Sequence, residues 1–267
     1  MRIRNRIILS DAGQRNLDAV EAALVALGAE KRIDVAILSH PHSDHVRNLL
    51  PLLADGWRIT TAVLSHSDWW NGTVTNRELI DTLRQQGTAL QYVSAGDHFD
   101  WGGADWEILN PPAGKYTGPG QAADSSVAYV LRLATTPPFE AVFTGDIGKS
   151  VASAVARSWS DEQLGSATVF LATHHGSANG STDTLLDAIH PRWAVLSTGP
   201  NSYGHPAEAA IGRLEQHGVT IWCTDANGTI RARIADDGTV TWSATKRSRP
   251  WWSTEGGADG TCVNRDH

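Results

Sequence analysis

Three histidines and one aspartate lie within six residues, directly after an apolar segment. His40, His42, Asp44 and His45 occupy the sequence HPHSDH. Imidazole and carboxylate groups that converge on one point are the ligands that divalent metal ions prefer. His40 and His42 alternate on an extended segment and project to the same side, whereas Asp44 and His45 begin the next helix and can point to a neighbouring position. The spacing therefore predicts one loop that serves two metal sites.

The segments that must position these residues repeat one pattern: an apolar strand, a short polar loop and a helix. Residues 33–39 form a near-continuous apolar run of the kind buried on both faces of a sheet, and this run leads to His40. Later apolar runs lead to Asp146, to the pair His174 and His175, and, after a few more residues, to His205. The pattern predicts an α/β fold that brings these side chains to one edge of its sheets.

Other segments are predicted from periodicity and turn residues. Apolar residues on one face predict a helix that starts near residue 14 and ends at Gly28, and a second helix is expected over residues 75–86. Residues 110–124 are rich in glycine and proline and are expected to form a surface loop. Residues 219–224, 228–234 and 238–244 alternate between turn signals, which predicts a terminal meander of three strands.

Composition limits the classes of protein that the chain can represent. With 267 residues and 41% hydrophobic residues, we expect a single domain over residues 1–245, followed by a tail over residues 246–267 that contains tryptophan and glycine. The net charge of −7 gives no global attraction to nucleic acid or to an anionic membrane. No apolar run approaches the ~20 residues of a membrane span, so we expect a cytoplasmic protein without a membrane partner. Cys223 and Cys262 are expected to be unpaired thiols.

The histidine cluster resembles a known signature. The residues from His40 to His45 match the HxHxDH motif of the metallo-β-lactamase superfamily, whose fold is an αββα sandwich with a two-metal site. LSDAG at Asp11 and FTGD ending at Asp146 resemble two further motifs of that family. HHGS, STGPNSYGHP and TDANGTI follow in the order found in the hydrolase domain of the ComEC/Rec2 competence proteins, which are DNA-uptake channels. The resemblance covers about residues 7–235.

The resemblance implies a role for each motif residue around two divalent metal ions, Zn²⁺ or Mn²⁺. His40 and His42 are expected to bind one ion, and Asp44 and His45 the other, with Asp146 as the bridging carboxylate. One downstream histidine completes the second site: His174 is the first choice and His205 the second. The catalytic residues are then Asp44, Asp146, His205 and His175, with His205 the candidate to protonate the leaving group. Asp11 is expected to orient a ligand histidine without touching metal.

The chain also departs from the family pattern at two places. Where relatives usually read DHxGG, this sequence has DHVRN, so Arg47 and Asn48 replace two glycines. The third motif normally supplies a histidine, but the corresponding segment here reads ADSSVAYVL. Asp124 or Ser126 is therefore the candidate replacement ligand, and we expect one of the two metals to bind more weakly. The membrane spans of the competence proteins have no counterpart in this sequence.

Further polar and aromatic residues are candidates for substrate binding. They are Arg47, Ser177, Asn201 and Tyr203. The 11 tryptophans are many for this length. DWW at residues 68–70 and PWW at residues 250–252 suit base stacking, although such clusters belong to cores or interfaces more often.

Three functions are compatible with these observations. The first is a metal-dependent phosphodiesterase, most simply a nuclease that acts on DNA or RNA. The second is a hydrolase of a small phosphodiester, an ester, a lactone or a thioester, because a fold alone does not select the substrate. The third is a partner-binding protein with a vestigial metal site, an alternative raised by the missing third-motif histidine. The sequence leaves the oligomeric state and any protein partner open.

Overall fold

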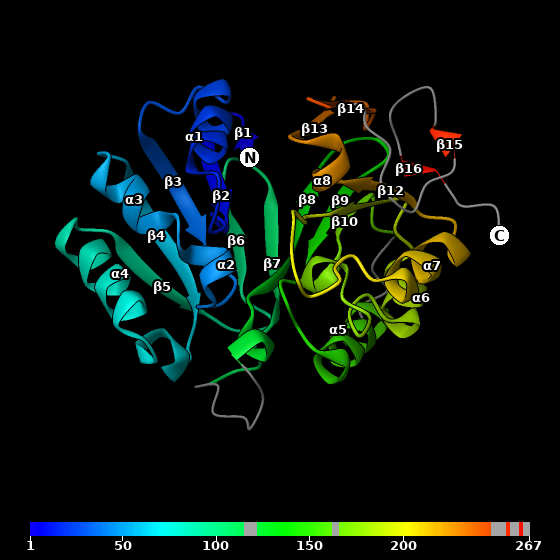
Figure 1. Ribbon diagram of the computed structural model, residues 1–267, viewed down its shortest axis with the longest axis horizontal. Coiled ribbons are helices and arrows are strands. Elements are labelled where there is room, and N and C mark those ends of the chain that lie inside the picture. Colours follow the sequence, from blue (N-terminus) through cyan, green and yellow to red (C-terminus); the bar gives the residue numbers. More distant parts are fainter. Residues whose placement is uncertain (115–121, 162–165, 247–254, 257–261, 264–267) are drawn as a thin grey trace. The chain divides into compact units, whose positions relative to one another are not determined.

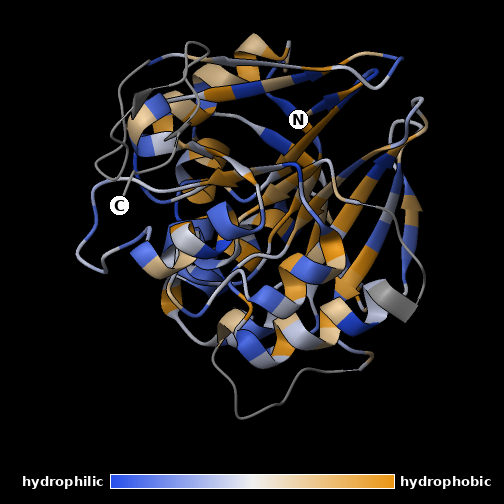
Figure 2. Cartoon of the chain, turned by 90° about the vertical axis from the view of Figure 1, so that its right-hand side faces the viewer, coloured by the Kyte–Doolittle hydropathy of each residue, from blue (hydrophilic) through white to orange (hydrophobic). Residues whose placement is uncertain are grey.

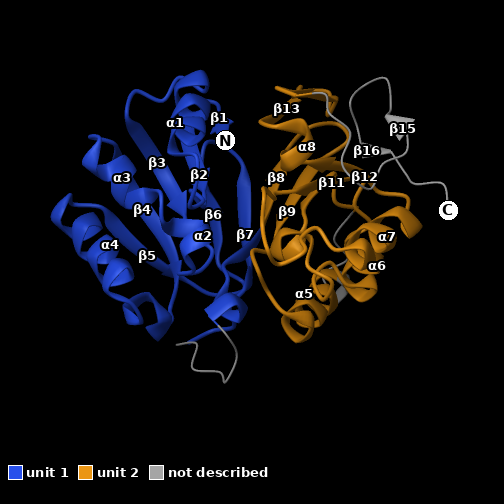
Figure 3. Cartoon of the chain, in the orientation of Figure 1, with its two compact units in different colours: residues 1–129 blue, residues 130–267 orange. Residues whose placement is uncertain are grey.

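The computed structural model describes residues 1–114, 122–161, 166–246, 255–256 and 262–263 (Figure 1). The chain divides into two compact units, residues 1–129 and residues 130–267 (Figure 3). The predicted tail lies mostly outside the described residues, and so does the centre of the loop predicted over residues 110–124. The predicted domain boundary at residue 245 stays a prediction.

The first unit is built on a five-stranded sheet with the order β1-β2-β3-β4-β5. β1 runs antiparallel to β2, and β2, β3, β4 and β5 are parallel. The strands are β1 (Arg2–Ile3), β2 (Arg6–Ser10), β3 (Arg32–Ile37), β4 (Arg58–Ser65) and β5 (Ala89–Val93). The unit also contains an antiparallel hairpin of β6 (His98–Asp100) and β7 (Asp105–Asn110), which belongs to the other large sheet.

Helices connect these parallel strands. They are α1 (Leu17–Ala26), α2 (Ser43–Val46), α3 (Leu49–Ala54) and α4 (Val74–Gln85), with the 3-10 turns η1 (Asp68–Asn71) and η2 (Ala122–Ser125). Gly28 follows α1 with φ 78°, as predicted for a left-handed helix end. The core of the unit joins apolar faces of α1, α3 and α4 to β3 and β4, and Leu24, Leu49, Leu83 and Ile33 are all fully or almost fully buried in it. In Figure 2 hydrophobic residues run along the strands, whereas hydrophobic and hydrophilic residues alternate on the helices.

The second unit contains strands in the order β8-β9-β10-β11-β12-β16-β15. From β9 to β12 neighbouring strands are parallel, and β16 is antiparallel to β12. The strands are β8 (Ala128–Leu133), which begins at the end of the first unit, β9 (Phe139–Phe143), β10 (Val169–Leu171), β11 (Trp193–Leu196), β12 (Thr220–Cys223), β15 (Glu255–Gly256) and β16 (Cys262–Val263). The helical segments are α5 (Lys149–Asp161), η3 (Thr173–Gly176), α6 (Asp183–Ile189), α7 (Glu208–Gln216) and α8 (Thr224–Asn227).

The predicted terminal meander is wrong for its first strand. β12 pairs in parallel with β11, whereas β13 (Ile230–Ile234) and β14 (Val240–Ala244) form an antiparallel pair of their own. The physical reason is the helix α7, which carries the chain back so that β12 enters the sheet in the same direction as β11. The short helix α8 then separates β12 from β13.

In both units the residues predicted to do chemistry follow the carboxyl ends of neighbouring parallel strands. Asp11 follows β2, and His40 follows β3. Asp146 follows β9, and His174 and His175 follow β10. This edge of a parallel sheet is where α/β folds usually place their ligands.

Candidate metal centre

A carboxylate organises the loop after β3 in the first unit. Asp11 has a left-handed backbone (φ 51°), and its amide donates to the carbonyl of Ile37 at 2.9 Å. Its side chain accepts hydrogen bonds from the amide of Ser39 at 2.8 Å and from the hydroxyl of Ser39 at 2.7 Å. These contacts fix the chain at the point where the histidine loop begins.

The same carboxylate fixes the ring of His45. Nδ1 of His45 lies 2.8 Å from Oδ2 of Asp11, and an ionised carboxylate can only accept, so Nδ1 carries the hydrogen. The lone pair of the ring is then on Nε2, which lies 3.8 Å from Oδ2 of Asp44. In metal sites a ligand histidine usually donates one ring N–H to a carboxylate or carbonyl and binds the ion with the other nitrogen, and the bond to Asp11 leaves Nε2 of His45 for that purpose.

The ring of His40 is fixed in the same way by two serines. Its Nδ1 lies 3.1 Å from Oγ of Ser39 and 3.3 Å from Oγ of Ser126. Both hydroxyls donate elsewhere, to Asp11 and to the carbonyl of Ala123, so they accept from Nδ1. With its own hydrogen on Nδ1, this fully buried ring accepts at Nε2 a hydrogen bond from Nδ1 of His42, at 2.9 Å. The bond keeps the two nitrogens adjacent, and both could bind one ion once His42 carries its hydrogen on Nε2.

Ser126 therefore contacts the ring of His40 at the nitrogen opposite Nε2. Asn110 holds this segment by donating to the carbonyls of Asp124 and Ser126, at 3.1 Å and 2.7 Å. In the described residues Ser126 orients a predicted ligand, which is a different role from that of the replacement ligand proposed for it from the sequence. The roles of Asp124 and Ser126 as direct ligands stay predictions.

The two residues that replace glycines next to His45 differ in their surroundings. Asn48 is buried and its amide donates to the carbonyls of Ala12 and Arg15, so it ties the end of the histidine loop to the segment after Asp11. Arg47 is exposed. The structure thus gives Asn48 a structural role and leaves the guanidinium of Arg47 accessible to an anion.

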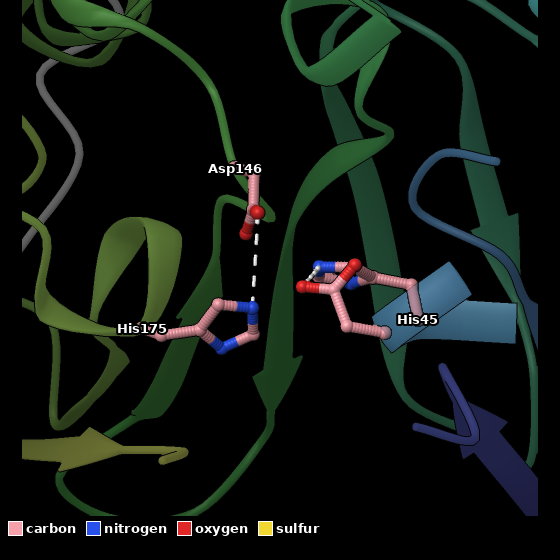
Figure 4. Close-up of side chains that lie close together, drawn as sticks. His45, Asp146 and His175 are labelled. Carbon is pink, nitrogen blue, oxygen red and sulfur yellow. Dashed lines mark ion pairs between the residues drawn. The ribbon is translucent and has the colours of Figure 1, made fainter. Parts of the chain in front are cut away.

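The second unit has its own group of ligand-type residues. β9 and β10 are parallel neighbours, so Asp146 and the two histidines of η3 come from adjacent strand ends. Asp146 is 3% exposed, and its Oδ2 lies 3.5 Å from Nε2 of His174 and 3.7 Å from Nε2 of His175. Figure 4 shows the ring of His175 directed at the carboxylate of Asp146.

The tautomer of His175 is also fixed. Its Nδ1 lies 2.8 Å from the carbonyl oxygen of Ser197, which can only accept, so Nδ1 carries a hydrogen. In the neutral form of the ring the lone pair is then on Nε2, which faces an acceptor on Asp146. A cation between the two atoms makes that arrangement favourable, and imidazole with carboxylate is a donor set that suits Zn²⁺ or Mn²⁺.

The backbone at this turn is unusual. His174 and His175 both have left-handed backbones, with φ 51° and 55°. Residues other than glycine rarely adopt this backbone conformation, and where they do it is often at a functional site. Gly176 continues the turn at φ 78°, and a Cβ on it would lie 2.9 Å from Leu196 and from Pro206. The sequence HHGS is therefore suited to a tight turn that aims two adjacent imidazoles at one carboxylate.

His205 lies beside these histidines. Its ring centroid is 5.6 Å from that of His174, and its Nδ1 is buried without a hydrogen-bond partner among the described residues. Burial lowers the pKa of His205, and the neighbouring His174 and His175 lower it further. The ring is therefore mainly neutral at pH 7, as a metal ligand must be.

Three of the predicted substrate-binding residues lie in the same unit. The hydroxyl of Ser177 accepts from the amide of Gly180, and the side chain of Asn201 bonds to main-chain atoms on both sides of its loop, including the amide and the carbonyl of His205. Both side chains thus hold turns. Tyr203 is 81% exposed and stacks on His205 with a centroid distance of 6.1 Å, so it is the accessible member of the set.

Sequence reasoning missed several residues that the structure places at the two groups. Ser39 contacts three predicted site residues, Asp11, His40 and His45. The carbonyl of Ser197 fixes His175, and Asn76 donates to the carbonyl of Pro41 inside the histidine loop. Ser39 stands directly before HxHxDH and could have been noticed. Ser197 begins the segment STGPNSYGHP, but its main-chain carbonyl makes the contact, which no residue type indicates. Asn76 lies outside the motifs and reaches the histidine loop from α4.

Comparison with known proteins places the chain in a described family. Residues 2–199 match the family model of the metallo-beta-lactamase superfamily. The chain is similar to ComE operon protein 3 of Bacillus subtilis, with 25% identity over 76% of this chain and 25% of that protein. It is also similar to competence protein ComA of Neisseria gonorrhoeae, with 27% identity over 89% of this chain and 31% of that protein. The chain thus spans only a quarter to a third of these relatives.

Among solved structures, the metallo-beta-lactamase fold protein YhfI of Bacillus subtilis is similar, with a TM-score of 0.48 and 15% identity over 88% of this chain and 86% of that one. The family match confirms the predicted fold class, an α/β fold with two mixed sheets and flanking helices. It also confirms the resemblance on which the motif roles were based. Among the described residues, no helix has the length and apolar character needed to cross a membrane.

Proposed function

Because the chain belongs to the metallo-beta-lactamase superfamily, we propose that it is a metal-dependent phosphodiesterase that cleaves nucleic acid. One observation carries the proposal: each unit pairs an imidazole Nε2 with a carboxylate oxygen, at 3.8 Å for His45 and Asp44 and at 3.7 Å for His175 and Asp146. Both distances exceed hydrogen-bond length. With the hydrogen of each neutral ring on Nδ1, both Nε2 atoms carry lone pairs that face a carboxylate, an arrangement that a metal ion between them would stabilise.

The proposed ligand set follows the sequence with one addition. In the set proposed from the sequence motifs, His40 and His42 hold one ion, and Asp44, His45 and Asp146 with one downstream histidine hold the other. The sequence favours His174 for this last place. The hydrogen bond from Nδ1 of His175 to Ser197 supports His175 as the better ligand, because its Nε2 is already oriented.

When bound, the two ions supply the Lewis acidity that activates the attacking water and neutralises the charge of the phosphate. The chain itself orients the ligand rings through Asp11, Ser39 and Ser126, so that little reorganisation is required. His205 is mainly neutral in the free protein because its pKa is lowered. A bound phosphate anion raises that pKa again, which prepares the ring to donate a proton to the leaving oxygen.

A nucleic acid is the substrate that the motif order supports best, because the order resembles that of the hydrolase domain of the ComEC/Rec2 competence proteins. A competence protein is also among the proteins similar to this chain. The net charge of −7 opposes long-range attraction of a polyanion. Local contacts must therefore supply the affinity, and the exposed guanidinium of Arg47, two residues after His45, is suited to a phosphate oxygen.

The test combines metal content with substrate range. The purified chain is reconstituted with Zn²⁺ or Mn²⁺, its metal content is measured by elemental analysis, and hydrolysis of single-stranded DNA, duplex DNA, RNA and bis(4-nitrophenyl) phosphate is followed. We expect close to two ions for each chain, one of them weaker, and turnover of a nucleic acid. A chain that binds no metal refutes the proposal, and turnover of bis(4-nitrophenyl) phosphate without turnover of any nucleic acid replaces it with the second function.

A further inference from the structure

A pocket of about 370 Å³ lies in the first unit beside the histidine loop. Its size is at the lower end of the range for small-molecule sites. The lining residues are Pro41, His42, Trp69, Gly72, Thr73, Asn76 and Ala122. Among the described residues that line it there is no lysine, arginine or carboxylate, so this lining suits an uncharged group better than the phosphate itself.

The two tryptophans of the DWW motif have different environments. Trp70 is 2% exposed and its Nε1 donates to the hydroxyl of Ser65, so it belongs to the core. Trp69 is 44% exposed and lines the pocket. The hydroxyl of Ser67 accepts from the amide of Trp69 and holds the turn η1 that presents this indole. An exposed aromatic face at a pocket is more informative than a scattered surface tryptophan.

The pocket is attached to the predicted metal ligands. His42 forms part of its wall, and the buried side chain of Asn76, in the first turn of α4, donates to the carbonyl of Pro41 at 3.1 Å. A group that enters this pocket therefore lies next to a residue that is expected to bind metal. The hydroxyl of Thr73 accepts a hydrogen bond from the amide of Asn76. Its own hydrogen can rotate towards the pocket, so the hydroxyl can donate to a ligand there.

We propose that this pocket is a nucleobase subsite, in which the base attached to the scissile phosphodiester stacks on Trp69; the inference rests on the proposed phosphodiesterase function. A nucleobase is planar and uncharged and carries acceptors at its edge, which matches an aromatic face, an uncharged lining and a nearby hydroxyl donor. Any base can stack on an indole, so this subsite selects nucleotides over simple phosphodiesters without selecting a sequence.

The test compares two esters that differ only in the presence of a nucleoside. They are thymidine 5′-(4-nitrophenyl phosphate) and methyl 4-nitrophenyl phosphate, and 4-nitrophenyl butyrate is added as an acyl ester. Trp69→Ala should lower the ratio of kcat/KM for the thymidine ester to that for the methyl ester by about 5- to 150-fold, mostly through KM. Trp69→Phe, which keeps an aromatic face, should restore most of this ratio.

The matched control is Tyr92→Ala. Tyr92 is 45% exposed, lies in the same unit and is not among the lining residues of this pocket. Its removal should leave the ratio at the wild-type value. A ratio that falls equally in both variants overturns the proposal, because a general loss of stability then explains it.

A binding measurement separates this inference from the proposed function. 2-Aminopurine riboside 5′-phosphate loses fluorescence when its base stacks, so the metal-free protein should quench it, Trp69→Phe should quench it too, and Trp69→Ala should not. Turnover of neither nitrophenyl phosphodiester by the wild-type chain defeats the proposed function. Turnover of both with an unchanged ratio in Trp69→Ala, or a loss that appears with the butyrate ester instead, overturns the nucleobase subsite alone.

Discussion

The two units orient their predicted ligand histidines with different parts of the chain. In the first unit, side chains orient the predicted ligands: Asp11 holds His45, and two serines hold His40. In the second unit, a main-chain carbonyl, that of Ser197, orients His175, and a left-handed turn places it. His40 and His45 of the first group are also better buried than the histidines of the second, with the side chain of His45 5% exposed against 24% for that of His175.

The difference determines how each group responds to substitution. A network of side chains can be weakened one contact at a time, and each lost contact leaves a ring that is free to turn. A main-chain carbonyl cannot be removed by substitution, so the second group should be sensitive only at its ligands and at the turn that carries them. The following predictions test this contrast.

The largest effects are expected when a carboxylate ligand of either unit is removed. Asp44→Ala and Asp146→Ala should each abolish phosphodiester hydrolysis, because each removes charge that holds the metal ions. Neither residue belongs to the hydrophobic core, so thermal unfolding should remain cooperative with a similar midpoint. Turnover close to wild type in either variant would show that this metal centre is not the catalyst.

Histidine substitutions in the second unit should separate ligands from proton donors. Either His174 or His175 is expected to be the ligand, and the alanine variant of that residue should lose metal and activity together. The oriented ring makes His175 the stronger candidate. His205→Ala should keep its metal and slow nucleic acid cleavage by about 10²–10⁴-fold. Its defect should be smaller on a nitrophenyl phosphodiester, since that leaving group needs less protonation.

The test measures metal content, the rate of nucleic acid cleavage and the rate of nitrophenyl phosphodiester hydrolysis for the alanine variants of His174, His175 and His205. Loss of metal from His205→Ala would reverse the assignment and make this ring a ligand, a role that its lowered pKa also permits. Loss from His174→Ala alone would return the ligand role to the residue favoured by the sequence.

A smaller effect is expected for the carboxylate that orients His45. Asp11→Asn keeps the size of the side chain but removes its charge, and metal affinity should fall by about 10–100-fold. Titration calorimetry with Zn²⁺ measures the change. The second unit offers no equivalent substitution, because Ser197 acts through its carbonyl: Ser197→Ala is the matched control and should bind metal as the wild type does.

The smallest effect is expected at Ser126. Ser126→Ala removes one of two hydroxyl contacts to Nδ1 of His40, while Ser39 keeps the other at 3.1 Å. The loss of one such hydrogen bond costs about 1 kcal/mol of stability, and metal affinity should fall less than in Asp11→Asn. An equal or larger loss of metal would identify Ser126 as a direct ligand, in line with its position in the third motif.

Much of the candidate site could be predicted from the sequence. The run of apolar residues before His40, the spacing of HxHxDH, and the strand ends before Asp146 and His174 all carry local signals, because burial and strand geometry depend on neighbouring residues. The order of these motifs also predicted the family. The wrong terminal meander has the opposite origin: the direction in which β12 joins the sheet depends on its partner β11, about 25 residues earlier in the chain.

What the tertiary structure decided is the set of contacts that turn ligand-type residues into oriented ligands. Ser126 reaches His40 across 86 residues, Asp11 reaches His45 across 34, and the carbonyl of Ser197 reaches His175 across 22. Only the tertiary structure, too, separated exposed Trp69 from buried Trp70 within one motif. The sequence determined the type of chemistry, because metal binding requires imidazole and carboxylate side chains and their positions can be read directly. Long-range hydrogen bonds and exposure depend on which strand ends become neighbours. Every residue has a main-chain carbonyl, so the sequence does not indicate which carbonyl will accept a hydrogen bond from a ligand histidine.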